Sequence, residues 1–584
     1  MKPSNEAIVA ALRQLVSYTQ LEDGQSQSFR TRAYEKAIDA ISGTSADVAD
    51  MSLGELKGID GVGDSTARKI LEYVQHGSIS KIDRLKERFP PTMLDLMKIP
   101  GLGPKTVLAL QDHLGVVDVE GLRNAIAQEK LRDLPGLGKK SEEKIASSID
   151  LLGIHSNDTR TPIFEAMRIA RRVIADLERT DAVRDIAYAG SLRRLSETIG
   201  DIDILVTSED PSTVISAFTS LAGVTVVQGS GTTKASVVID DVIQVDLRVV
   251  ETQAFGAALL YFTGSKGHNI ELRQRAIDRG LTLNEYSLSD VESGDVIAAT
   301  TEESIYEALG LPWITPELRE GTGEVGAAEA GYLPQTVGEH ALRGDLHVHT
   351  DWSGDGRSSM RDMLDTAVGL GLEYVALTDH AEDLAINGLS RERVLEEAIV
   401  IADIRGEYPD LEILHGAELN IGPDGGIDYD DEFLEVFDFT VASVHSHFEL
   451  DEARQTARLI AAINHPAVNV IGHPSGRKIG RRPGIRFDIE EVGRAAAHAG
   501  AALEINSHLQ RLDLSASHLR SAIGIEGLLF AVSTDAHHVS ELSQRRWGVA
   551  QARKGGVAPS RIVNSLPIGE FRAWIARKSD ASPL

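Results

Sequence analysis

Histidine and acidic residues recur at the ends of apolar, strand-like segments between residues 345 and 537. The segments read YVALTDH, ILHGAEL, FTVASVH, VNVIGH and FAVSTDAH, and stretches of helical periodicity alternate with them. When parallel strands alternate with helices, the polar residues that follow each strand meet at one end of the sheet. The pattern therefore predicts a β/α barrel whose functional site lies at the carboxyl ends of its strands.

The residues at these predicted strand ends are of the types that bind metals. They are His347, His349, Asp355, His380, Glu418, His445, His473, Asp535 and His537. Neutral imidazoles and carboxylates suit Zn²⁺, Mn²⁺ or Fe²⁺, and the chain has no cysteine to offer instead. A single such residue is more often solvated or hydrogen-bonded, but nine gathered in one place without an ion would need costly partners. We therefore expect a metal centre.

A second acidic cluster is predicted upstream, in GDIDILVTS. Asp201 and Asp203 are one residue apart in a strand-like segment, so their side chains point the same way. Asp246, in QVDLRVV, completes a three-carboxylate cluster if its strand pairs beside the first. Such a cluster can hold two Mg²⁺ ions for phosphoryl or nucleotidyl transfer. The alternative is three solvated carboxylates at strand ends.

The residues that precede this strand offer groups for a phosphate ligand. Gly190, Ser191 and Arg194 supply a backbone N–H, a hydroxyl and a guanidinium, which together suit a triphosphate.

Three segments in the first 150 residues repeat one pattern, at 56–74, 96–114 and 131–149. In each, an apolar pair is followed by Gly-x-Gly and then by a helical period. Free N–H groups at the start of the second helix form an anion site, so we predict contacts with DNA phosphates. The alternative is that the glycines only turn the chain. The predicted contact residues are Gly61, Gly63, Gly101, Gly103, Gly136, Gly138, Lys105, Lys139 and Lys140.

Charge and composition limit the classes of protein that the chain can represent. The net charge is −29, yet residues 1–150 hold 20 Lys and Arg against 22 Asp and Glu, so this part is nearly neutral. DNA contacts must therefore come from local donors and not from a broadly basic surface. The amino terminus lacks the pattern of a signal peptide, and no apolar run is long enough to span a membrane. We expect a cytoplasmic, nucleoid-associated protein that is a monomer.

The motifs GSLRR, GDID and VDLRVV and the run YFTGSKGHNIELRQRAIDRGLTLNEYSL (261–288) resemble those of the family X DNA polymerases, of which DNA polymerase beta is a member. The resemblance implies helix-hairpin-helix domains followed by an α+β nucleotidyltransferase palm and a thumb. It also implies that Asp201, Asp203 and Asp246 bind two Mg²⁺ or Mn²⁺ ions. The nucleotide-binding residues that it implies are Gly190, Ser191, Arg194 and Gly200 for the triphosphate, Tyr261, Phe262, Gly264 and Asn269 for the sugar and base, and Arg273 for the template.

Lys69 is of interest for a different reaction. By its spacing in the helix after GVG it is more simply a solvated surface charge than a Schiff-base nucleophile. The family resemblance, however, places it at the 5′-deoxyribose-phosphate lyase nucleophile. Two residues depart from the family pattern: Ser65 replaces a basic residue found in many lyase-competent members, and Leu195 replaces a glycine often found after the Arg pair.

The strand-end residues after residue 341 resemble those of the PHP (polymerase and histidinol phosphatase) family. The resemblance implies a distorted TIM-like (β/α) barrel of about seven strands that holds three divalent ions, Mn²⁺ or Zn²⁺, and hydrolyses phosphoesters. One ion would be held by His347, His349, Glu418 and Asp535. Glu418 would also bind a second ion, together with His445 and His473. The third ion would be held by Asp355, His380 and His537. Next to His473 lies the basic run 476–486, in which Arg477, Arg481 and Arg482 favour a nucleic-acid substrate, unless the loop is simply solvated.

The predicted domains are an N-terminal lyase-like helical domain (1–85), a fingers-like domain (86–151), the palm (152–252), the thumb (253–318), a Gly-, Ala- and Glu-rich linker (319–340) and the PHP domain (341–575). The order is similar to that of bacterial and archaeal family X polymerases with a C-terminal PHP domain. It implies short-gap filling in DNA repair from gapped or primer-template DNA and dNTPs, with 3′–5′ exonuclease and, as a further option, abasic-site cleavage. The alternatives are a template-independent nucleotidyltransferase, a barrel that acts as a small-molecule phosphatase, and a non-enzymatic DNA-end scaffold.

Overall fold

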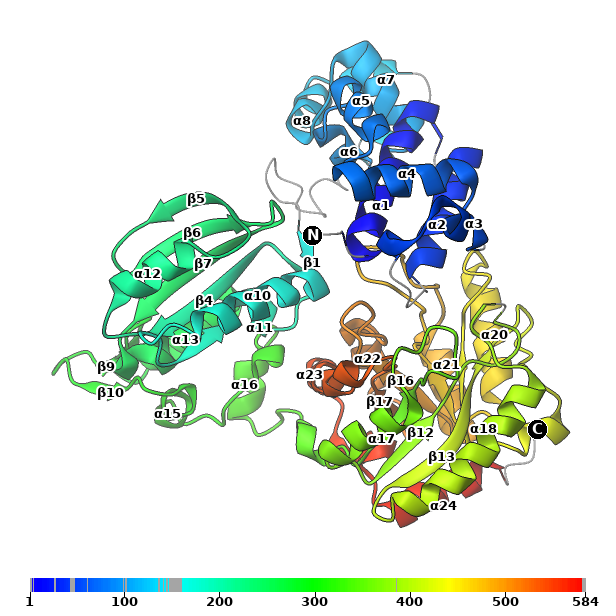
Figure 1. The fold of residues 1–584 in the computed structure, drawn as a ribbon. Helices are drawn as coiled ribbons and strands as arrows, with labels where there is room; N and C mark the ends of the chain where they lie inside the picture. The colour runs from blue at the N-terminus through cyan, green and yellow to red at the C-terminus, as the bar shows by residue number, and fades with distance from the viewer. Residues whose placement is uncertain are drawn as a thin grey trace. The chain divides into compact units, whose positions relative to one another are not determined.

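The computed structural model describes residues 3, 5–25, 28–42, 48–59, 61–97, 99, 102–134, 137–139, 141–142, 145, 160–384 and 386–579. The chain forms two compact units, residues 1–159 and residues 160–584. Figure 1 shows helices in the first unit and both helices and sheets in the second. The second unit contains a mixed sheet, a small antiparallel sheet and a parallel barrel.

The described part of the first unit is helical. Its helices are α1 (Asn5–Asp23), α2 (Phe29–Ser42), α3 (Leu53–Gly58), α4 (Asp64–His76), α5 (Ser80–Arg88), α6 (Thr92–Leu96), α7 (Pro104–Leu114) and α8 (Val119–Ala127). Their apolar faces share one core, which includes Leu12, Ile70 and Leu110, all fully buried. Burial of these apolar stripes, and not helix propensity, stabilises helices as short as these.

The three repeated segments make the same turn. The N–H groups of Val62, Leu102 and Leu137 each donate to the carbonyl three residues earlier, at Ile59, Ile99 and Leu134. Gly63 and Gly103 are the N-cap residues of α4 and α7. Gly61 has φ +89°, and a Cβ there would lie 3.1 Å from the Lys36 carbonyl oxygen, so this position requires glycine.

The palm is a five-stranded sheet in the order β2-β4-β7-β6-β5. Its strands are β2 (Ile186–Tyr188), β4 (Asp201–Thr207), β5 (Val224–Ser230), β6 (Lys234–Ile239) and β7 (Ile243–Val250), and helices α10 (Ile163–Leu177) and α12 (Pro211–Thr219) pack against it. β4 and β7 are parallel neighbours, and the other pairs are antiparallel. Asp240 and Asp241 both have positive φ in the turn between β6 and β7, which suits a tight hairpin.

The thumb follows directly from the palm. It comprises α13 (Phe255–Thr263), α14 (Lys266–Ile277), the sheet β8 (Leu281–Leu283), β9 (Leu288–Asp290) and β10 (Val296–Ala298), and α15 (Glu302–Ala308). The segment expected as a linker contains helix α16 (Glu324–Glu329), whose Val325 and Ala328 are buried in the thumb core. Burial of these two side chains explains why this short stretch forms a helix instead of an extended linker.

The last part of the chain is a seven-stranded parallel barrel. Its strands occur in sequence order as β11 (Gly344–Val348), β12 (Tyr374–Leu377), β13 (Glu412–Asn420), β14 (Phe439–Ser443), β15 (Val470–Gly472), β16 (Ala502–Asn506) and β17 (Leu529–Ser533). A parallel bridge between Val348 and Ala536 brings the two outer strands together, so the barrel is nearly closed. The surrounding helices include α17 (Met360–Gly369), α18 (Arg391–Ile404), α20 (Glu452–Ile463), α21 (Ile489–Ala499), α22 (Ala516–Ala522), α23 (Arg545–Gly555) and α24 (Ile568–Ser579). The predicted fold class is confirmed.

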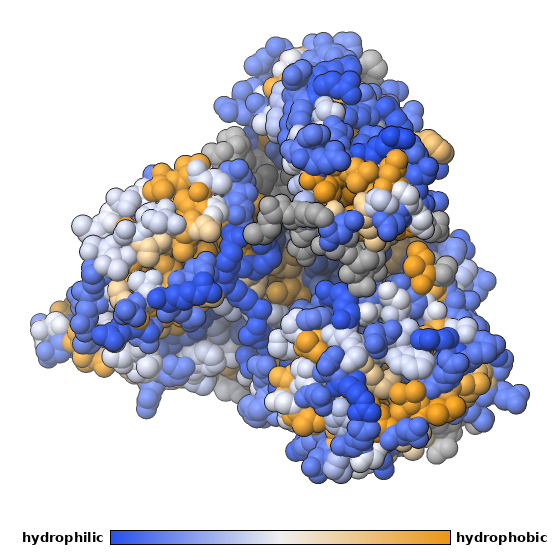
Figure 2. Space-filling view, viewed as in Figure 1, coloured by the Kyte–Doolittle hydropathy of each residue, from blue (hydrophilic) through white to orange (hydrophobic). Residues whose placement is uncertain are grey.

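Hydrophilic residues cover much of the visible surface, with smaller apolar areas (Figure 2). One apolar area lies over the β5 edge of the palm, where Val226 and Val227 are about half exposed. Among the described residues, no helix combines the length and hydropathy needed to cross a membrane.

Candidate active sites

The first candidate site is built where β4 and β7 lie side by side. In their parallel register Asp203 is the direct partner of Asp246, and Asp201 is the partner of Gln244. Asp201 and Asp203 therefore share one face of β4 with Asp246 next to them. This pairing confirms the strand arrangement on which the three-carboxylate prediction depended.

The electrostatics of this cluster favour a cation. Burial, together with the charges of Asp201 and Asp246, raises the pKa of Asp203 to about 7, which is the shift expected of crowded carboxylates. Gln244 donates to both oxygens of Asp246, at 3.1 and 3.0 Å. Gly190 packs so closely that a Cβ there would lie 2.4 Å from Asp203 Oδ2, so the GS motif must begin with glycine.

A cavity of about 660 Å³ opens in front of Asp201 and Asp203. All nine predicted nucleotide-binding residues line it: Gly190, Ser191, Arg194, Gly200, Tyr261, Phe262, Gly264, Asn269 and Arg273. Arg160 and Lys266 also line the cavity, and the sequence reasoning did not name them. Lys266 could have been found, because it lies inside the run YFTGSKGHN, whereas Arg160 carries no local signal.

Aromatic and amide groups fix one wall of this cavity. The rings of Tyr261 and Phe262 meet edge to face with centroids 5.0 Å apart, and Arg273 lies over the Tyr261 ring. Asn269 donates to the Tyr261 carbonyl at 2.7 Å. These contacts come from α13 and α14, so the thumb sets the shape of the wall.

The two arginines of GSLRR have different partners. Arg193 donates to both oxygens of the buried Glu302, which Arg319 also binds in bidentate fashion. Arg194 instead donates to the Thr263 carbonyl at the cavity wall, at 2.6 Å. Leu195 has φ +55° and is buried, so the glycine often found there in the family would avoid a strain of about 1 kcal/mol.

The second candidate site lies at the carboxyl end of the barrel, and Glu418 is at its centre. Glu418 Oε2 lies 3.4 Å from His347 Nε2, 3.5 Å from His349 Nε2 and 2.9 Å from His380 Nδ1. Its other oxygen, Oε1, lies 3.2 Å from His445 Nε2 and 3.0 Å from His473 Nε2. One carboxylate thus joins five imidazoles that follow or belong to four different strands, β11, β12, β14 and β15.

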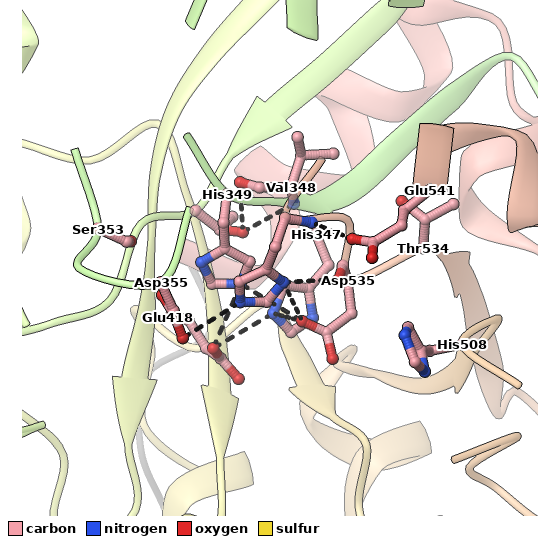
Figure 3. Close-up of polar contacts among 12 residues, drawn as sticks. His347, Val348, His349, Ser353, Asp355, Glu418, His508, Thr534, Asp535 and Glu541 are labelled. Carbon is pink, nitrogen blue, oxygen red and sulfur yellow. Dashed lines mark hydrogen bonds and ion pairs between the residues drawn. The ribbon is translucent and has the colours of Figure 1, made fainter. Parts of the chain in front are cut away.

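The remaining predicted ligands complete the same cluster. Asp535 Oδ1 lies 3.7 Å from His347 Nε2 and 3.5 Å from His349 Nε2, and Figure 3 shows these side chains pointing toward one another. Asp355 Oδ2 lies 3.3 Å from His380 and 3.4 Å from His537. All nine residues named from the sequence therefore converge.

The cluster fits divalent ions by its donor set. Buried ligand atoms of His347, His349, His380, Glu418 and His473 have no hydrogen-bond partner, which would be costly without a cation. Three groups of ligand atoms lie close enough to share an ion: His349, His380 and His537; His347, His349 and Glu418; and His380, Glu418 and His445. Asp535 and His473 have positive φ, the kind of backbone strain often found at functional sites.

Five imidazoles of the cluster have shifted pKa values, in two directions. Although burial opposes their charge, nearby carboxylates raise the pKa of His347, His380 and His537. Burial and the neighbouring His537 and His380 lower the pKa of His349 to about 4, and burial with the charge of Arg511 lowers the pKa of His473 to about 3. Both rings are thus neutral at pH 7, the state in which a ring nitrogen can ligate a metal.

Residues around the cluster were missed by the sequence reasoning. Glu504 Oε1 lies 2.8 Å from His347 Nδ1, so this β16 carboxylate fixes the ring as the outer partner of a ligand histidine usually does. Arg511 Nε lies 3.2 Å from Asp535 Oδ2, and burial with Arg511 nearby lowers the pKa of Lys478 to about 8. The run LEINSH around Glu504 carries the same strand-end signature as the others and could have been recognised.

The basic loop 476–486 has partners within the protein. Arg477 donates to Glu197 of the palm at 2.8 Å and to the Arg511 carbonyl at 2.7 Å. Arg481 lies over the ring of Phe164 and Arg482 over that of Phe448. The sequence interpretation assigned this loop to a DNA strand, whereas these contacts place it at the junction of palm and barrel. DNA contact by these three arginines stays a prediction.

In the first unit, Lys69 is partly buried and donates to Ser65 Oγ at 2.7 Å. Burial and the charges of Lys81 and Arg30 lower its pKa. Lys105 and Lys139 are exposed near the hairpins, and Gly138 precedes a turn in which Ser141 N–H donates to its carbonyl. Gly101, Gly136 and Lys140 lie outside the described residues.

Family models match most of the chain. A helix-hairpin-helix domain matches residues 3–79, a SAM-like helix-hairpin-helix tandem 93–150, the DNA polymerase beta palm 160–262, the DNA polymerase beta thumb 258–320 and the PHP domain 345–508. Fold, sites and models together define a family X polymerase scaffold joined to a PHP domain.

Three relatives illustrate the relationship. The DNA polymerase/3′-5′ exonuclease PolX of Bacillus subtilis is 36% identical over 573 residues, which cover 98% of this chain and 99% of that protein. The chain therefore belongs to the PolX family. Rat DNA polymerase lambda is 28% identical over 334 residues, 51% of this chain and 53% of its own length. A probable phosphatase of Thermoanaerobacter sp. is 28% identical over 255 residues, 40% of this chain and 94% of its own length.

Proposed function

We propose that the chain is a DNA polymerase that fills short gaps in DNA repair and also trims 3′ ends with a 3′–5′ exonuclease in its barrel. The observation that carries the proposal is the pairing of Asp203 with Asp246 beside a cavity lined by all nine predicted nucleotide-binding residues. The Bacillus relative, which is similar from end to end, is named for a DNA polymerase and a 3′-5′ exonuclease activity, and this supports both halves of the proposal.

In the palm, different side chains would bind different parts of the nucleotide and its metal ions. Asp201, Asp203 and Asp246 would hold two Mg²⁺ or Mn²⁺ ions, which when bound neutralise phosphate charge and favour in-line displacement. Ser191 and Arg194 supply a hydroxyl and a guanidinium to the triphosphate. The aromatic wall, with Tyr261 and Phe262, would orient the sugar and base, so that reacting atoms meet in the productive geometry.

In the barrel, nine side chains would hold three divalent ions, Mn²⁺ or Zn²⁺, that polarise a scissile phosphate and lower the pKa of a bound water. Glu504 orients His347, and Arg511 and Lys478 supply positive charge on the Asp535 side of the site. Cations beside the cluster suit the phosphates of a DNA strand.

We also propose that Lys69 acts as a lyase nucleophile on a 5′-deoxyribose phosphate. Its lowered pKa increases the fraction of neutral amine, and Arg30 and Lys81 near it would attract a 5′-phosphate.

A gapped DNA duplex tests the main proposal in one assay. Asp201→Ala with Asp203→Ala should abolish gap filling and leave 3′-end degradation, and His347→Ala with His349→Ala should do the reverse. Incorporation restricted to the templated base excludes a template-independent transferase. Loss of both activities in either folded double variant would overturn the two-site proposal.

A second function is worth testing for the barrel alone, because a probable phosphatase of Thermoanaerobacter is similar over 40% of the chain. Hydrolysis of a 3′-recessed DNA end should exceed that of small phosphate esters. The opposite ranking would favour a small-molecule phosphatase.

A further inference from the structure

The segment that follows the GS motif is held from the barrel side by two basic residues. Lys554, near the end of α23, contacts Arg194, and Arg477 contacts Glu197. Both contacts fall between α11 (Gly190–Arg193) and the carboxylate strand β4, so they act on the stretch of palm that carries the nucleotide-binding groups. A barrel residue is therefore in direct contact with the backbone of the polymerase site.

Lys554 has the more specific geometry of the two. Its ammonium donates to the Arg194 carbonyl at 2.7 Å and to Glu320 Oε1 at 2.6 Å. The side chain is only 11% exposed. An ammonium withdrawn from water needs such partners, so its position is tightly defined.

The carbonyl that Lys554 binds belongs to the end of a helix. Arg194 is the C-cap residue of α11, where the last carbonyls have no partner within the helix. The Lys554 ammonium satisfies this oxygen, because α23 packs against the neighbouring turn Pro316–Leu318 and places its end there. Lys554 therefore caps the helix that begins with the Gly190-Ser191 motif.

The same network reaches the Arg194 side chain. Glu320 Oε2 lies 3.5 Å from Arg194 Nε, while Arg194 Nη1 donates to the Thr263 carbonyl. Glu320 thus binds Lys554 with one oxygen and lies beside Arg194 with the other. Loss of the lysine would leave Glu320 free to draw the guanidinium away from the cavity wall.

We infer that Lys554 of the barrel is a positioning residue for the polymerase: it holds Arg194, and with it the triphosphate side of the nucleotide cavity. This inference rests on the proposed polymerase function and deepens it. The PHP barrel then serves nucleotide binding in the palm in addition to its own chemistry, without contact with the nucleotide.

The test compares Lys554→Met with Arg553→Ala. Arg553 precedes Lys554 on α23 and binds the Val337 carbonyl and Glu317, so it is a matched control at the same junction. We expect Lys554→Met to raise the KM for dNTP roughly tenfold with a much smaller change in kcat, because a misplaced ligand group weakens binding. Arg553→Ala should leave this KM unchanged, both variants should keep exonuclease activity, and Lys554→Arg should restore part of the loss. Equal KM values for Lys554→Met and Arg553→Ala would overturn the inference.

Two further measurements keep the result interpretable. Glu320→Gln breaks the network from the thumb side and should also raise the KM, even if Lys554→Met folds poorly. In a double-mutant cycle of Lys554→Met and Arg194→Met, the combined increase in the KM for dNTP should be clearly smaller than the product of the two single increases, because both substitutions act on the Arg194 side chain. A combined increase equal to that product would overturn the inference.

Calorimetric binding of dATP with Mg²⁺ separates this inference from the proposed function. A wild-type protein that binds dATP but extends no primer would overturn the polymerase function and not the positioning role. A Lys554→Met protein that binds dATP as tightly as the wild type would overturn the positioning role alone.

Discussion

Asp203 and Asp246 are direct neighbours across the parallel pair β4–β7, although 42 residues separate them in the chain. Neither residue alone explains the raised pKa of Asp203, which follows from burial and from the charges of Asp201 and Asp246 together. The cluster is therefore a property of the sheet.

This pairing predicts that cation binding in the palm depends on pH. Because the pKa of Asp203 is raised to about 7, the carboxyl is mostly neutral below that pH and cannot bind a cation well. Mg²⁺ affinity should fall by up to about tenfold per pH unit below 7 and level off above pH 8. Calorimetry on the His347→Ala, His349→Ala protein, in two buffers of different ionisation enthalpy, should also detect a released proton below pH 7. The matched Asp203→Asn variant should release none, and an affinity independent of pH from 5 to 8 would contradict the prediction.

Divalent ions should stabilise the barrel. Its buried ligand atoms without hydrogen-bond partners repel or remain unsatisfied when no cation is present. Removal of metal with EDTA should therefore lower the thermal midpoint of the barrel, and added Mn²⁺ should restore it in proportion to binding. This change in thermal midpoint should persist in the double variant Asp201→Ala, Asp203→Ala and should vanish in the double variant His347→Ala, His349→Ala. A midpoint insensitive to EDTA would argue against a resident metal centre.

The buried pair of Glu302 and Arg319 should contribute strongly to thumb stability. Although burial opposes its charge, Arg319 and Arg193 lower the pKa of Glu302 to about 2. The contribution of Glu302 to the free energy of unfolding is therefore fully present above its unfolded pKa of about 4 and is lost as the pH falls toward 2. Glu302→Gln leaves two cations without their partner and should cost about 3–5 kcal/mol at pH 7. Hydrogen exchange of α15 amides measures this loss locally. The difference from wild type should shrink at pH 3, and equal protection at pH 7 would show that the network contributes little.

Lys69 should form a covalent adduct if it is the lyase nucleophile. Borohydride reduction on DNA with a 5′-deoxyribose phosphate traps the Schiff base. Lys69→Ala should lose the adduct, and Arg68→Ala, which removes the neighbouring cation paired with Asp64, should retain it. An adduct of normal yield in Lys69→Ala would assign the chemistry to another amine.

The sequence was most informative where a local period or strand end carries the signal. The alternation of Asp201 and Asp203, the Gly-x-Gly hairpins and the histidines after apolar strands are all short-range patterns. The run LEINSH ends a strand as the predicted ligands do, so a polar site residue could have been expected there. That Glu504 binds the outer nitrogen of His347 depends on the packing of strands and has no local signal in the sequence. The positive charge of loop 476–486 is visible in the sequence, whereas its contacts with Glu197 and Phe164 are not, and DNA contact by this loop stays a prediction.

By itself, the sequence predicted the chemistry: which residues would bind cations and phosphates, which strands present them and, through family motifs, which two sites they would form. Only the tertiary structure decided which groups meet: Asp203 with Asp246, Glu418 with five imidazoles, and Lys554 with Arg194. The physical reason is that side-chain alternation and turn chemistry act over a few residues, whereas these contacts arise from strand register and domain packing, which depend on burial throughout the chain.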